Sequence, residues 1–258
     1  MNVRDKVCVV TGGASGIGLA LCTRFAQDRA HVVLSDLRQE ACEREAEPIH
    51  ALPVAADVGQ EEDIANLVAT TLDHFGRIDL MVSNAGIGID GGIDMATEQW
   101  QKIINVNLMS EVWGAKYAVP HMLEQGSGYL LNTASAAGLL VIFDTVGYTV
   151  TKHAAIGFTE WLAATYIDQG IGVSVLVPAA VKTPILAGKE DTPEGQDAIT
   201  TAELADIVME GLAEERFMIN THPWVLEKFA VKARDYDEYI RMMRAGRAAA
   251  EPKTAAAV

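Results

Sequence analysis

The sequence predicts an α/β fold, a doubly wound parallel sheet of about seven strands with helices on both faces. Three observations predict it. Short apolar runs alternate with helix-length stretches as far as about residue 220, the pattern of repeated strand–helix–strand units. Hydrophobic residues make up 50% of the 258 residues, enough for a sheet that is buried on both faces. A glycine-rich turn also stands between the first apolar run and the first helix-length stretch.

Strands and helices are expected in alternation along the chain. The first strand is expected at 6–10, where Lys-Val-Cys-Val-Val is typical of a buried parallel strand. The later strands are expected at 31–35, 50–55, 78–83, 128–133, 171–177 and 216–220. The helices are expected near 17–28, 38–47, 60–75, 97–125, 147–168 and 202–214. No internal repeat and no linker interrupts the series, so residues 1–222 are expected to form one domain.

Residues 185–201 form the longest polar stretch that contains Gly and Pro. A long loop in a compact domain is often a lid or a binding loop, so we expect this segment to contact a ligand. The last residues, 248–258, are rich in alanine and contain Pro252. They are expected to be a disordered tail.

Residues 223–247 are expected to form one C-terminal docking helix, with Pro223 in its first turn. Apolar residues spaced three and four apart make a single stripe along it: Leu226, Phe229, Ala233, Tyr236, Ile240 and Met243. Such a stripe must pack on another surface. The helix could cover the edge of its own domain, or it could lie over an active site of its own or of a neighbouring chain.

Composition argues against several classes of partner and site. The net charge is −15, so a nucleic-acid surface, which depends on Lys and Arg, is not expected. No apolar run reaches the roughly 18 residues of a membrane span, and the first strand follows the N-terminus without a leader, so a cytoplasmic protein is expected. The three cysteines follow no pattern, and no His, Cys and carboxylate residues have metal-ligand spacing, so neither disulfides nor a metal are expected.

The glycine-rich turn runs from residue 11 to 18 as Thr-Gly-Gly-Ala-Ser-Gly-Ile-Gly. Glycines let the backbone approach a pyrophosphate closely, and the helix N-terminus behind them offers free N–H groups and a positive dipole. The second strand ends in Asp36, whose carboxylate can accept hydrogen bonds from ribose hydroxyls. A plain strand–helix connection would leave Asp36 unexplained. We therefore expect a dinucleotide to bind here.

Tyr148 and Lys152 stand four residues apart in an expected helix, so their side chains share one helix face. A lysine ammonium beside a phenol favours the ionised phenolate, which makes the tyrosine usable as an acid or base near neutral pH. Ser135 precedes Tyr148 by 13 residues and could hold a substrate oxygen near the phenol. A packed tyrosine and a solvated lysine share this spacing by chance in many helices. The glycine turn in the same chain favours a catalytic role for the pair over chance spacing.

From about residue 4 to 220 the chain resembles the compact, single-domain short-chain dehydrogenase/reductases, and this implies a Rossmann-like fold and an NAD(P)-dependent oxidoreductase. The glycine spacing is that of the family, and its other motifs follow in order: Gly12, Gly16 and Gly18, then Asp57-Val58, Asn84-Ala85-Gly86, Asn107, Ser135, Tyr148, Lys152, and Pro178 to Thr183. One position departs from the family pattern. Ala179 stands where glycine is usual, so the backbone that faces the nicotinamide could have a different shape.

The resemblance implies a role for each catalytic residue. Tyr148 would take the hydroxyl proton of an alcohol, or protonate the forming alkoxide in the reverse reaction. Lys152 would stabilise the phenolate and bind the nicotinamide ribose, and Ser135 would donate a hydrogen bond to the substrate oxygen. Asn107 would interrupt its helix and hold a water that links Lys152 to solvent; an ordinary exposed helix asparagine is the alternative.

The resemblance also implies the cofactor-binding residues: Gly12, Ser15, Gly16, Ile17, Gly18, Asp36, Asp57, Val58, Asn84, Ala85, Gly86, Tyr148, Lys152, Pro178, Val181 and Thr183. Asp36 would bind the adenine ribose and repel a 2′-phosphate, so NAD is favoured over NADP. Arg38 argues the other way, since a guanidinium two residues beyond Asp36 could pair with a 2′-phosphate. Asp57 and Val58 would hold the adenine.

The residues expected near the substrate are small or apolar: Ala136, Ala137, Leu139, Val141, Phe143, Ala179, Ala180, Ile185 and Leu186. Since buried polar groups need partners, this wall suits a neutral, fairly hydrophobic secondary alcohol or ketone. Asp144 is expected near the substrate mouth, where it either contacts substrate or is solvated. His153 follows Lys152 but lies off the shared helix face, so packing or an interface is expected for it.

Two other functions remain open, a nucleotide-sugar epimerase or dehydratase and a nonenzymatic dinucleotide sensor on the same fold. A homo-oligomer, a tetramer or a dimer, is expected. The helices at 97–125 and 147–168 carry apolar residues beyond one face, namely Trp113, Val119, Met122, Phe158, Trp161 and Leu162.

Overall fold

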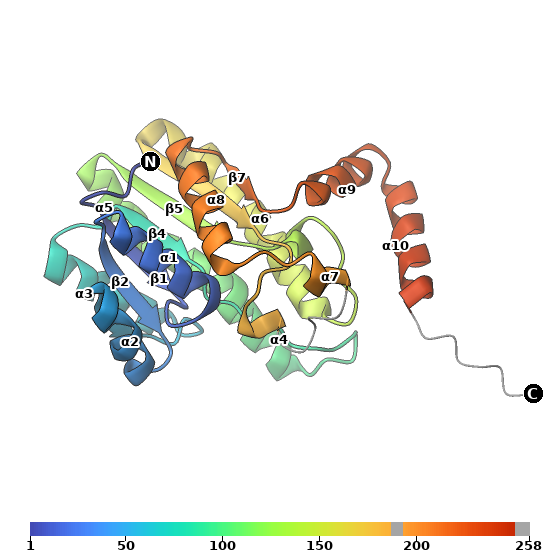
Figure 1. Cartoon of the computed structure of the whole chain (residues 1–258), viewed down its shortest axis with the longest axis horizontal. Coiled ribbons are helices and arrows are strands. Elements are labelled where there is room, and N and C mark those ends of the chain that lie inside the picture. The colour runs from blue at the N-terminus through green and yellow to red at the C-terminus, as the bar shows by residue number, and fades with distance from the viewer. Residues whose placement is uncertain (187–192, 251–258) are drawn as a thin grey trace, which may run out of the picture.

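The computed structural model describes residues 1–186 and 193–250, and these contain one seven-stranded parallel sheet of order β3-β2-β1-β4-β5-β6-β7 (Figure 1). Its strands are β1 Val7–Thr11, β2 His31–Asp36, β3 Leu52–Ala55, β4 Leu80–Ser83, β5 Gly128–Thr133, β6 Ile171–Val177 and β7 Met218–Asn220. The predicted doubly wound α/β fold is confirmed. The strand order reverses between β1 and β4, and in such sheets ligands bind in the crevice at the carboxyl ends of these strands.

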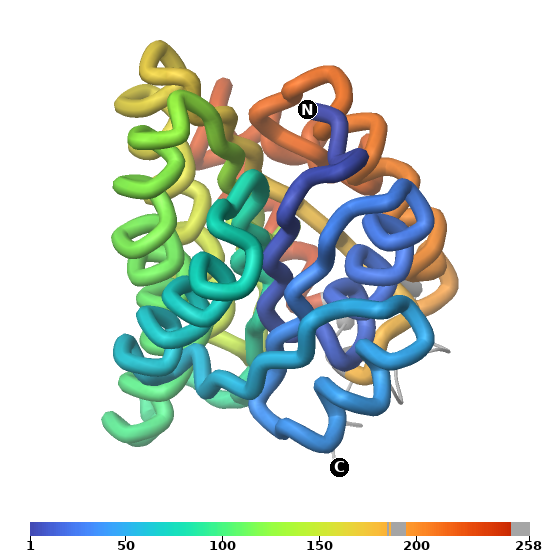
Figure 2. Tube along the Cα trace, turned by 90° about the vertical axis from the view of Figure 1, so that its left-hand side faces the viewer, coloured from blue at the N-terminus to red at the C-terminus, as the bar shows by residue number. Residues whose placement is uncertain are grey.

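Helices form a layer on each face of the sheet. One layer contains α1 (Gly16–Gln27), α2 (Gln39–Ala46) and α8 (Thr201–Ala213), and the other contains α3 (Glu61–Phe75), α5 (Ser110–Gln125) and α6 (Val146–Tyr166) (Figure 2). The remaining helices before β7 are α4 (Thr97–Ile104) and the short α7 (Pro193–Gln196). Single 3₁₀ turns lie at Glu47–Ile49, Ala136–Gly138, Ile167–Gln169 and Pro184–Leu186.

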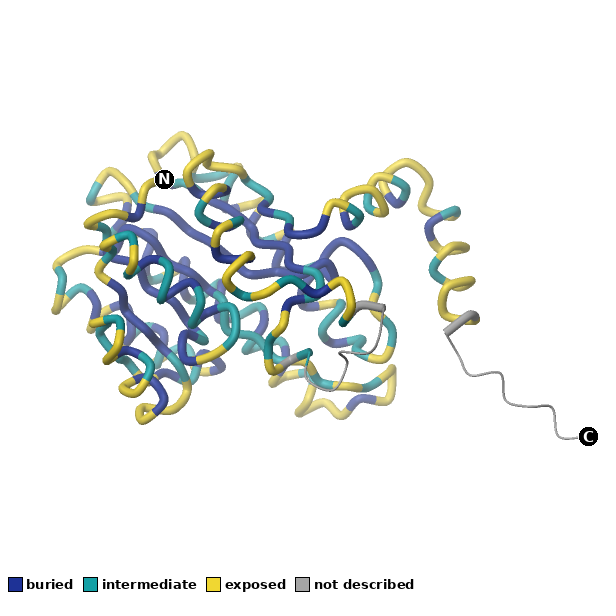
Figure 3. Tube along the Cα trace, in the orientation of Figure 1, coloured by how far each residue is buried: buried dark blue, intermediate teal, exposed yellow. Residues whose placement is uncertain are grey.

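The strands are apolar because both of their faces are covered. In β1, Cys8 and Val10 pack with α1 and α8, whereas Val9 packs with α3 and α5 on the other side. Successive side chains of a strand point to opposite faces, so a continuous apolar run is what a doubly covered strand requires. Figure 3 shows the strands buried and the outward faces of the helices exposed. The core therefore holds the strand ends, and the loops that follow them, in fixed positions.

Three strands begin two residues later than predicted, β3 at Leu52, β4 at Leu80 and β7 at Met218. For β3 the reason is local. His50 has a φ of 53°, in the left-handed region, so the chain cannot be extended there. The sequence pattern shows apolar residues but not this turn.

The helix predicted over 97–125 is wrong as a single element. It consists of α4, a π-helical turn at Asn105–Met109, and α5. In a π turn each carbonyl pairs with the N–H five residues on, so the turn holds one extra residue. Asn107 lies in the middle of it.

The predicted single C-terminal helix is also wrong, since the chain forms α9 (Pro223–Arg234) and α10 (Tyr236–Ala250). Asp235 separates them with an extended backbone, φ −147° and ψ 96°. Its carboxylate accepts a hydrogen bond from the Glu238 N–H at 2.8 Å, which is how an aspartate caps the N-terminus of a new helix. The tail expected at 248–258 begins inside α10, and its residues 251–258 lie outside the described part.

This break changes which C-terminal side chains are buried. Val225, Lys232 and Tyr239 are buried, whereas Leu226, Tyr236 and Ile240 of the predicted stripe are more than 40% exposed. Phe229 and Met243 of the stripe pack against the cluster that contains Leu139, Ile156 and Val177. Side chains of both helices thus pack into the cluster that contains β6 residues, while α10 itself stands away from the sheet (Figure 1).

Candidate active site

A cavity of about 540 Å³ opens at the carboxyl ends of the strands, where the strand order reverses. Most of the predicted site residues line it: Gly12, Ser15, Gly16, Ile17, Asp36, Asp57, Val58, Asn84, Ala85, Gly86, Ser135, Tyr148, Lys152, Pro178, Val181 and Thr183. Gly18 and Asn107 are the two predicted site residues outside this lining. Residues from six different loops therefore converge on one space.

The glycine turn has the backbone that only glycine adopts easily. Gly12 has a φ of 65° and Gly16 a φ of 53°, both in the left-handed region. A Cβ at Gly18 would lie 2.1 Å from the carbonyl oxygen of Gly12, so a side chain there would force the turn apart. Ser15 precedes α1 without a side-chain cap. The N-terminus of α1 therefore presents its backbone amides at the cavity, as binding of a pyrophosphate requires.

Asp36 ends β2 at the side of this turn. Its carboxylate accepts hydrogen bonds from the Ala14 N–H at 3.1 Å and the Leu37 N–H at 2.8 Å. These bonds fix the carboxylate against the glycine turn while it still lines the cavity. Arg38, the residue that argued for NADP, is exposed and begins α2. A carboxylate that can accept hydrogen bonds thus lines the cavity beside the glycine turn.

The turn after β4 is tied to the end of β1 by Thr11. Its hydroxyl accepts hydrogen bonds from the N–H groups of Asn84 at 3.0 Å and Ala85 at 3.1 Å. The Asn84 side-chain amide donates to the Thr11 carbonyl at 2.9 Å. Thr11 thus holds Asn84 and Ala85 in place at the bottom of the cavity. The sequence motif includes Thr11 but predicts no function for it.

Asp57 and Val58, predicted to hold an adenine, line the cavity after β3. Asp57 Oδ1 accepts a hydrogen bond from the Gly59 N–H at 2.9 Å, and the Asp57 N–H donates to Asp63 at 2.8 Å. Val58 is buried. A polar and an apolar residue therefore stand side by side in the cavity lining, and their role in holding an adenine stays a prediction.

Ser135 follows β5 and lines the cavity. Its Oγ accepts a hydrogen bond from the Ala137 N–H at 3.1 Å and donates to the Pro178 carbonyl at 3.4 Å. Ala179 has no left-handed backbone, and its N–H donates to the Thr221 hydroxyl at 3.2 Å. Alanine therefore fits this loop without strain.

Tyr148 and Lys152 enter the cavity from α6. Lys152 is 2% exposed, and its Nζ donates to the Thr133 carbonyl at 2.6 Å. The same Nζ lies 5.9 Å from the centre of the Tyr148 ring. A buried ammonium thus lies next to the phenol. It has N–H groups left to donate to other partners, as its two predicted roles, stabilising the phenolate and binding a ribose, require.

Asn107 is buried in the π turn, which removes the alternative of an exposed helix asparagine. Its Oδ1 accepts from the Ile87 N–H at 2.8 Å, and its Nδ2 donates to the Ile87 carbonyl at 2.9 Å and to Thr151 at 3.3 Å. The side chain therefore pins the loop after β4 to α6, next to Lys152.

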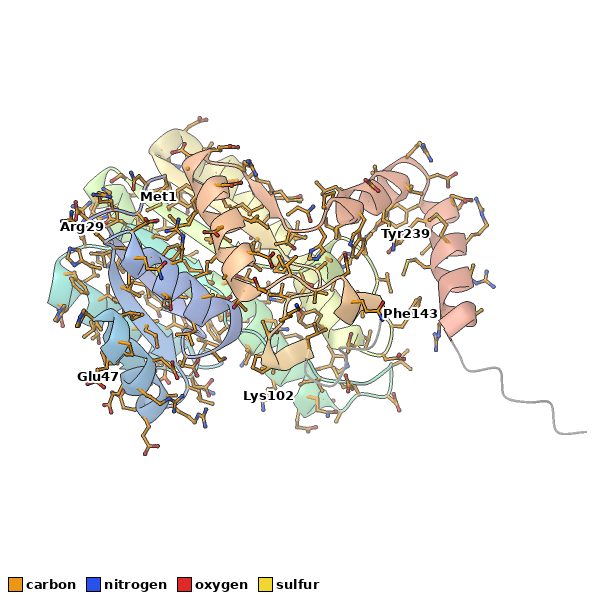
Figure 4. The ribbon with its side chains drawn as sticks, viewed as in Figure 1. Met1, Arg29, Glu47, Lys102, Phe143 and Tyr239 are labelled. Atoms are coloured by element: carbon orange, nitrogen blue, oxygen red, sulfur yellow. The ribbon has the colours of Figure 1, made fainter. Side chains whose placement is uncertain are left out.

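A second cavity, of about 490 Å³, is lined partly by the loop after β5. Val141 and Phe143, which the sequence placed near the substrate, line it together with Asp144. Arg247 of α10 lines it too and stacks 5.4 Å from the centre of the Phe143 ring. Figure 4 shows Phe143 and Tyr239 on the side of the molecule that the C-terminal helices flank.

The C-terminal helices bind this loop directly. The Val141 N–H donates to the Tyr239 hydroxyl at 2.7 Å, and the Lys232 Nζ donates to the Leu139 carbonyl at 2.7 Å. Burial is the main cause that raises the pKa of Tyr239, so its hydroxyl stays protonated. His153, predicted to pack or form an interface, lies here against Lys232.

The predicted substrate wall is only partly correct. Ala179, Ala180 and Leu186 line the first cavity, but Ala136, Ala137 and Leu139 are buried outside both linings. The Ile185 side chain lies outside the described residues. Sequence reasoning missed Leu37, Ala56, Ile87, Lys102, Val106, Thr133, Ala134 and Pro184 in the lining. Most of these residues are neighbours in sequence of a predicted site residue. Lys102, labelled in Figure 4, is not, so no motif pointed to it.

The family of short chain dehydrogenases matches residues 6–194. The chain belongs to the short-chain dehydrogenase/reductase family. It is therefore an NAD(P)-dependent oxidoreductase, and the resemblance seen in its motifs is confirmed.

Named relatives of this short-chain dehydrogenase cover most of its length. A 2-(R)-hydroxypropyl-CoM dehydrogenase of Xanthobacter autotrophicus is 34% identical over 243 residues, which are 86% of this chain and 97% of the relative. A cyclohexanol dehydrogenase of Acinetobacter is 34% identical over 194 residues, 72% of this chain and 77% of the relative. A Burkholderia phymatum short-chain dehydrogenase solved with NAD superposes with a TM-score of 0.84 at 28% identity, covering 92% and 96% of the two chains.

Within residues 1–186 and 193–250 of this dehydrogenase, no helix is long and apolar enough to cross a membrane.

Proposed function

We propose that this protein is an NAD-dependent dehydrogenase that interconverts a neutral, fairly hydrophobic secondary alcohol and its ketone. Tyr148 is the acid/base, assisted by Lys152, Ser135 and Asn107. The observation that carries the proposal is that Ser135, Tyr148 and Lys152 line the same cavity as the glycine turn and Asp36. Two relatives are named for hydroxypropyl-CoM and cyclohexanol, which both carry a secondary hydroxyl, and this supports a secondary alcohol as the substrate; of the two, only cyclohexanol is neutral and hydrophobic.

Each residue has one physical task in this reaction. Ser135 holds the substrate oxygen next to the Tyr148 phenol, because positioning within hydrogen-bond reach precedes proton transfer. The phenolate form of Tyr148 takes the hydroxyl proton, and the Lys152 ammonium stabilises that form by opposite charge. Asn107 fixes the loop after β4 and the start of α6. The nicotinamide, when bound, supplies the acceptor or donor of two electrons.

Asp36 supports NAD over NADP. Its carboxylate lines the cavity beside the glycine turn, and the N–H groups of Ala14 and Leu37 hold it in place. A 2′-phosphate, which carries nearly two negative charges, would be repelled at this position. The NAD seen with the Burkholderia phymatum structure agrees with this preference.

The test is a panel of secondary alcohols and ketones read by cofactor absorbance, with NAD and NADP in parallel. We expect turnover with NAD and a neutral, hydrophobic member of the panel. NAD binding without turnover of any member would support the dinucleotide sensor instead. Binding of a nucleotide sugar, measured by calorimetry, together with no turnover of simple ketones would support the epimerase class.

A further inference from the structure

Glu111 is a buried carboxyl group on α5 with no role in the family resemblance. It is 2% exposed, and its Oε2 has no hydrogen-bond partner. A carboxylate out of water with an unpaired oxygen is costly, so such a side chain is rarely kept for packing alone. The group needs a physical explanation.

Glu111 lies in the first turn of α5, directly after the π turn that contains Asn107. It follows Asn107 by four residues, so the two side chains share one face of the helix. Asn107 reaches Thr151 of α6, and Lys152 is the next residue. A Cβ placed on Gly86 would lie 3.5 Å from Asn107 Oδ1 and 3.6 Å from Lys152 Nζ, so the amide and the ammonium adjoin one point.

Lys152 is the charged group that acts on Glu111. Burial raises the pKa of Glu111 to about 8, and the attraction of the Lys152 ammonium opposes that rise. The strands packed against α5 carry one titratable side chain, Tyr129, whose hydroxyl bonds Ser174. On the α3 side, Glu61 accepts hydrogen bonds from Lys116 and Tyr117 of α5 at the surface.

We infer that Glu111 is a positioning residue for the Tyr148–Lys152 pair: its buried carboxyl group, within electrostatic range of the Lys152 ammonium, sets the pH range in which that ammonium supports the phenolate. This inference rests on the proposed function. While Glu111 is protonated, the full charge of Lys152 acts on Tyr148. Once Glu111 ionises, its negative charge offsets part of that field, and the phenolate is less favoured.

The first test is the pH profile of kcat/KM for alcohol oxidation in the wild type and in Glu111→Gln. The amide keeps the size of the side chain but cannot ionise. We expect the pH of half-maximal kcat/KM to fall by roughly half a unit or more in the variant, because the opposing charge never forms. Glu124→Gln, an exposed change on the same helix, is the control and should leave the profile unchanged.

The second test reads Glu111 without any turnover. Infrared spectra in D₂O should contain a band of a protonated carboxylic acid at pH 7 that is absent in Glu111→Gln. In Lys152→Met the band should persist to higher pH, because the stabilising ammonium is gone. A profile of Glu111→Gln that superimposes on the wild type, or a band that Lys152→Met leaves unmoved, overturns the inference. A wild type that turns over no alcohol would instead contradict the proposed function.

Discussion

Lys232 of α9 donates a hydrogen bond from Nζ to Nε2 of His153 at 2.9 Å. His153 is the residue after Lys152, so this bond joins the C-terminal helices to α6, the helix that carries Tyr148 and Lys152. The other ring nitrogen of His153, Nδ1, lies 2.9 Å from the Thr149 carbonyl. Because Nε2 accepts from an ammonium, Nδ1 carries the proton and donates to Thr149. The C-terminal helices thereby help to hold α6 in position at the candidate site.

Lys232→Met should lower stability and weaken substrate binding while NAD affinity holds. The change leaves the Leu139 carbonyl and His153 Nε2 without their buried donor, which costs about 1–3 kcal/mol. The measurements are the melting temperature, KM for the substrate, and Kd for NAD. Lys228→Met, an exposed change on the same helix, is the control. A variant that loses only melting temperature would assign these helices a structural role alone.

His153→Gln should make the melting temperature less sensitive to acid. Burial is the main cause that lowers the pKa of His153, opposed by its bond to Thr149, and Lys232 lowers it further. The unfolded chain therefore binds this proton more readily than the folded one. Stability is lost as the pH falls below about 6.5, the ordinary histidine value, through the lower folded value. Melting curves of both proteins between pH 8 and about 5 check this; parallel curves would contradict it.

Tyr148→Phe should reduce kcat by about 100-fold or more and spare NAD binding, since only the acid/base oxygen is lost. Steady-state kinetics and calorimetry with NAD separate the two effects. Lys152→Ala is the comparison, and it should damage both turnover and NAD affinity because its two roles are lost together. A Tyr148→Phe enzyme with near-normal kcat would remove Tyr148 from its proposed role.

Asp36→Asn should narrow the preference for NAD over NADP by roughly tenfold. Asparagine keeps an oxygen for the Ala14 N–H but removes the charge that repels a 2′-phosphate. The ratio of kcat/KM for the two cofactors is the measurement. If the wild type already prefers NADP, the assignment to Asp36 is wrong, and Arg38→Ala should then lower the efficiency with NADP.

The protein should be a homo-oligomer at micromolar concentration, with α5 and α6 in the contact. Trp161 is 56% exposed, and Val150 and Leu123 are exposed on the same two helices. Large apolar side chains at the surface favour an interface. Light scattering gives the mass of the wild type and of Trp161→Glu, which should dissociate. A monomeric wild type would refute the proposal.

The motifs could be predicted because they depend on short spacings along the chain. Each motif lies on a single unit of local structure. The glycine turn and Asp36 share one strand–helix–strand unit, and Tyr148 and Lys152 share one helix, so short-range spacing fixes their relative positions. The pattern is less informative about the oligomer. It predicts Val119, Met122 and Leu162 as surplus apolar residues, yet they are buried in this chain's own core. Helical periodicity cannot tell a wide buried face from an interface.

Contacts between distant segments could not be predicted. Lys232 and Leu139 are 93 residues apart, and Val141 and Tyr239 are 98 apart. Lys232 is a charged residue beside an apolar stripe, so its burial has no sequence signal. The single-helix prediction failed because Asp235 caps a new helix. An aspartate is equally common at an exposed position inside a helix, so the residue type alone does not mark the break.

The π turn at Asn105–Met109 also gives the chain an unusual sensitivity to length. One residue in an α-helix corresponds to a rotation of about 100°. Deleting a single residue from this turn would therefore rotate the 16 residues of α5 against α4. Glu111 would leave the interior, and Lys116 would lose its alignment with Glu61. A one-residue deletion here should thus be far more harmful than any single substitution in the same turn.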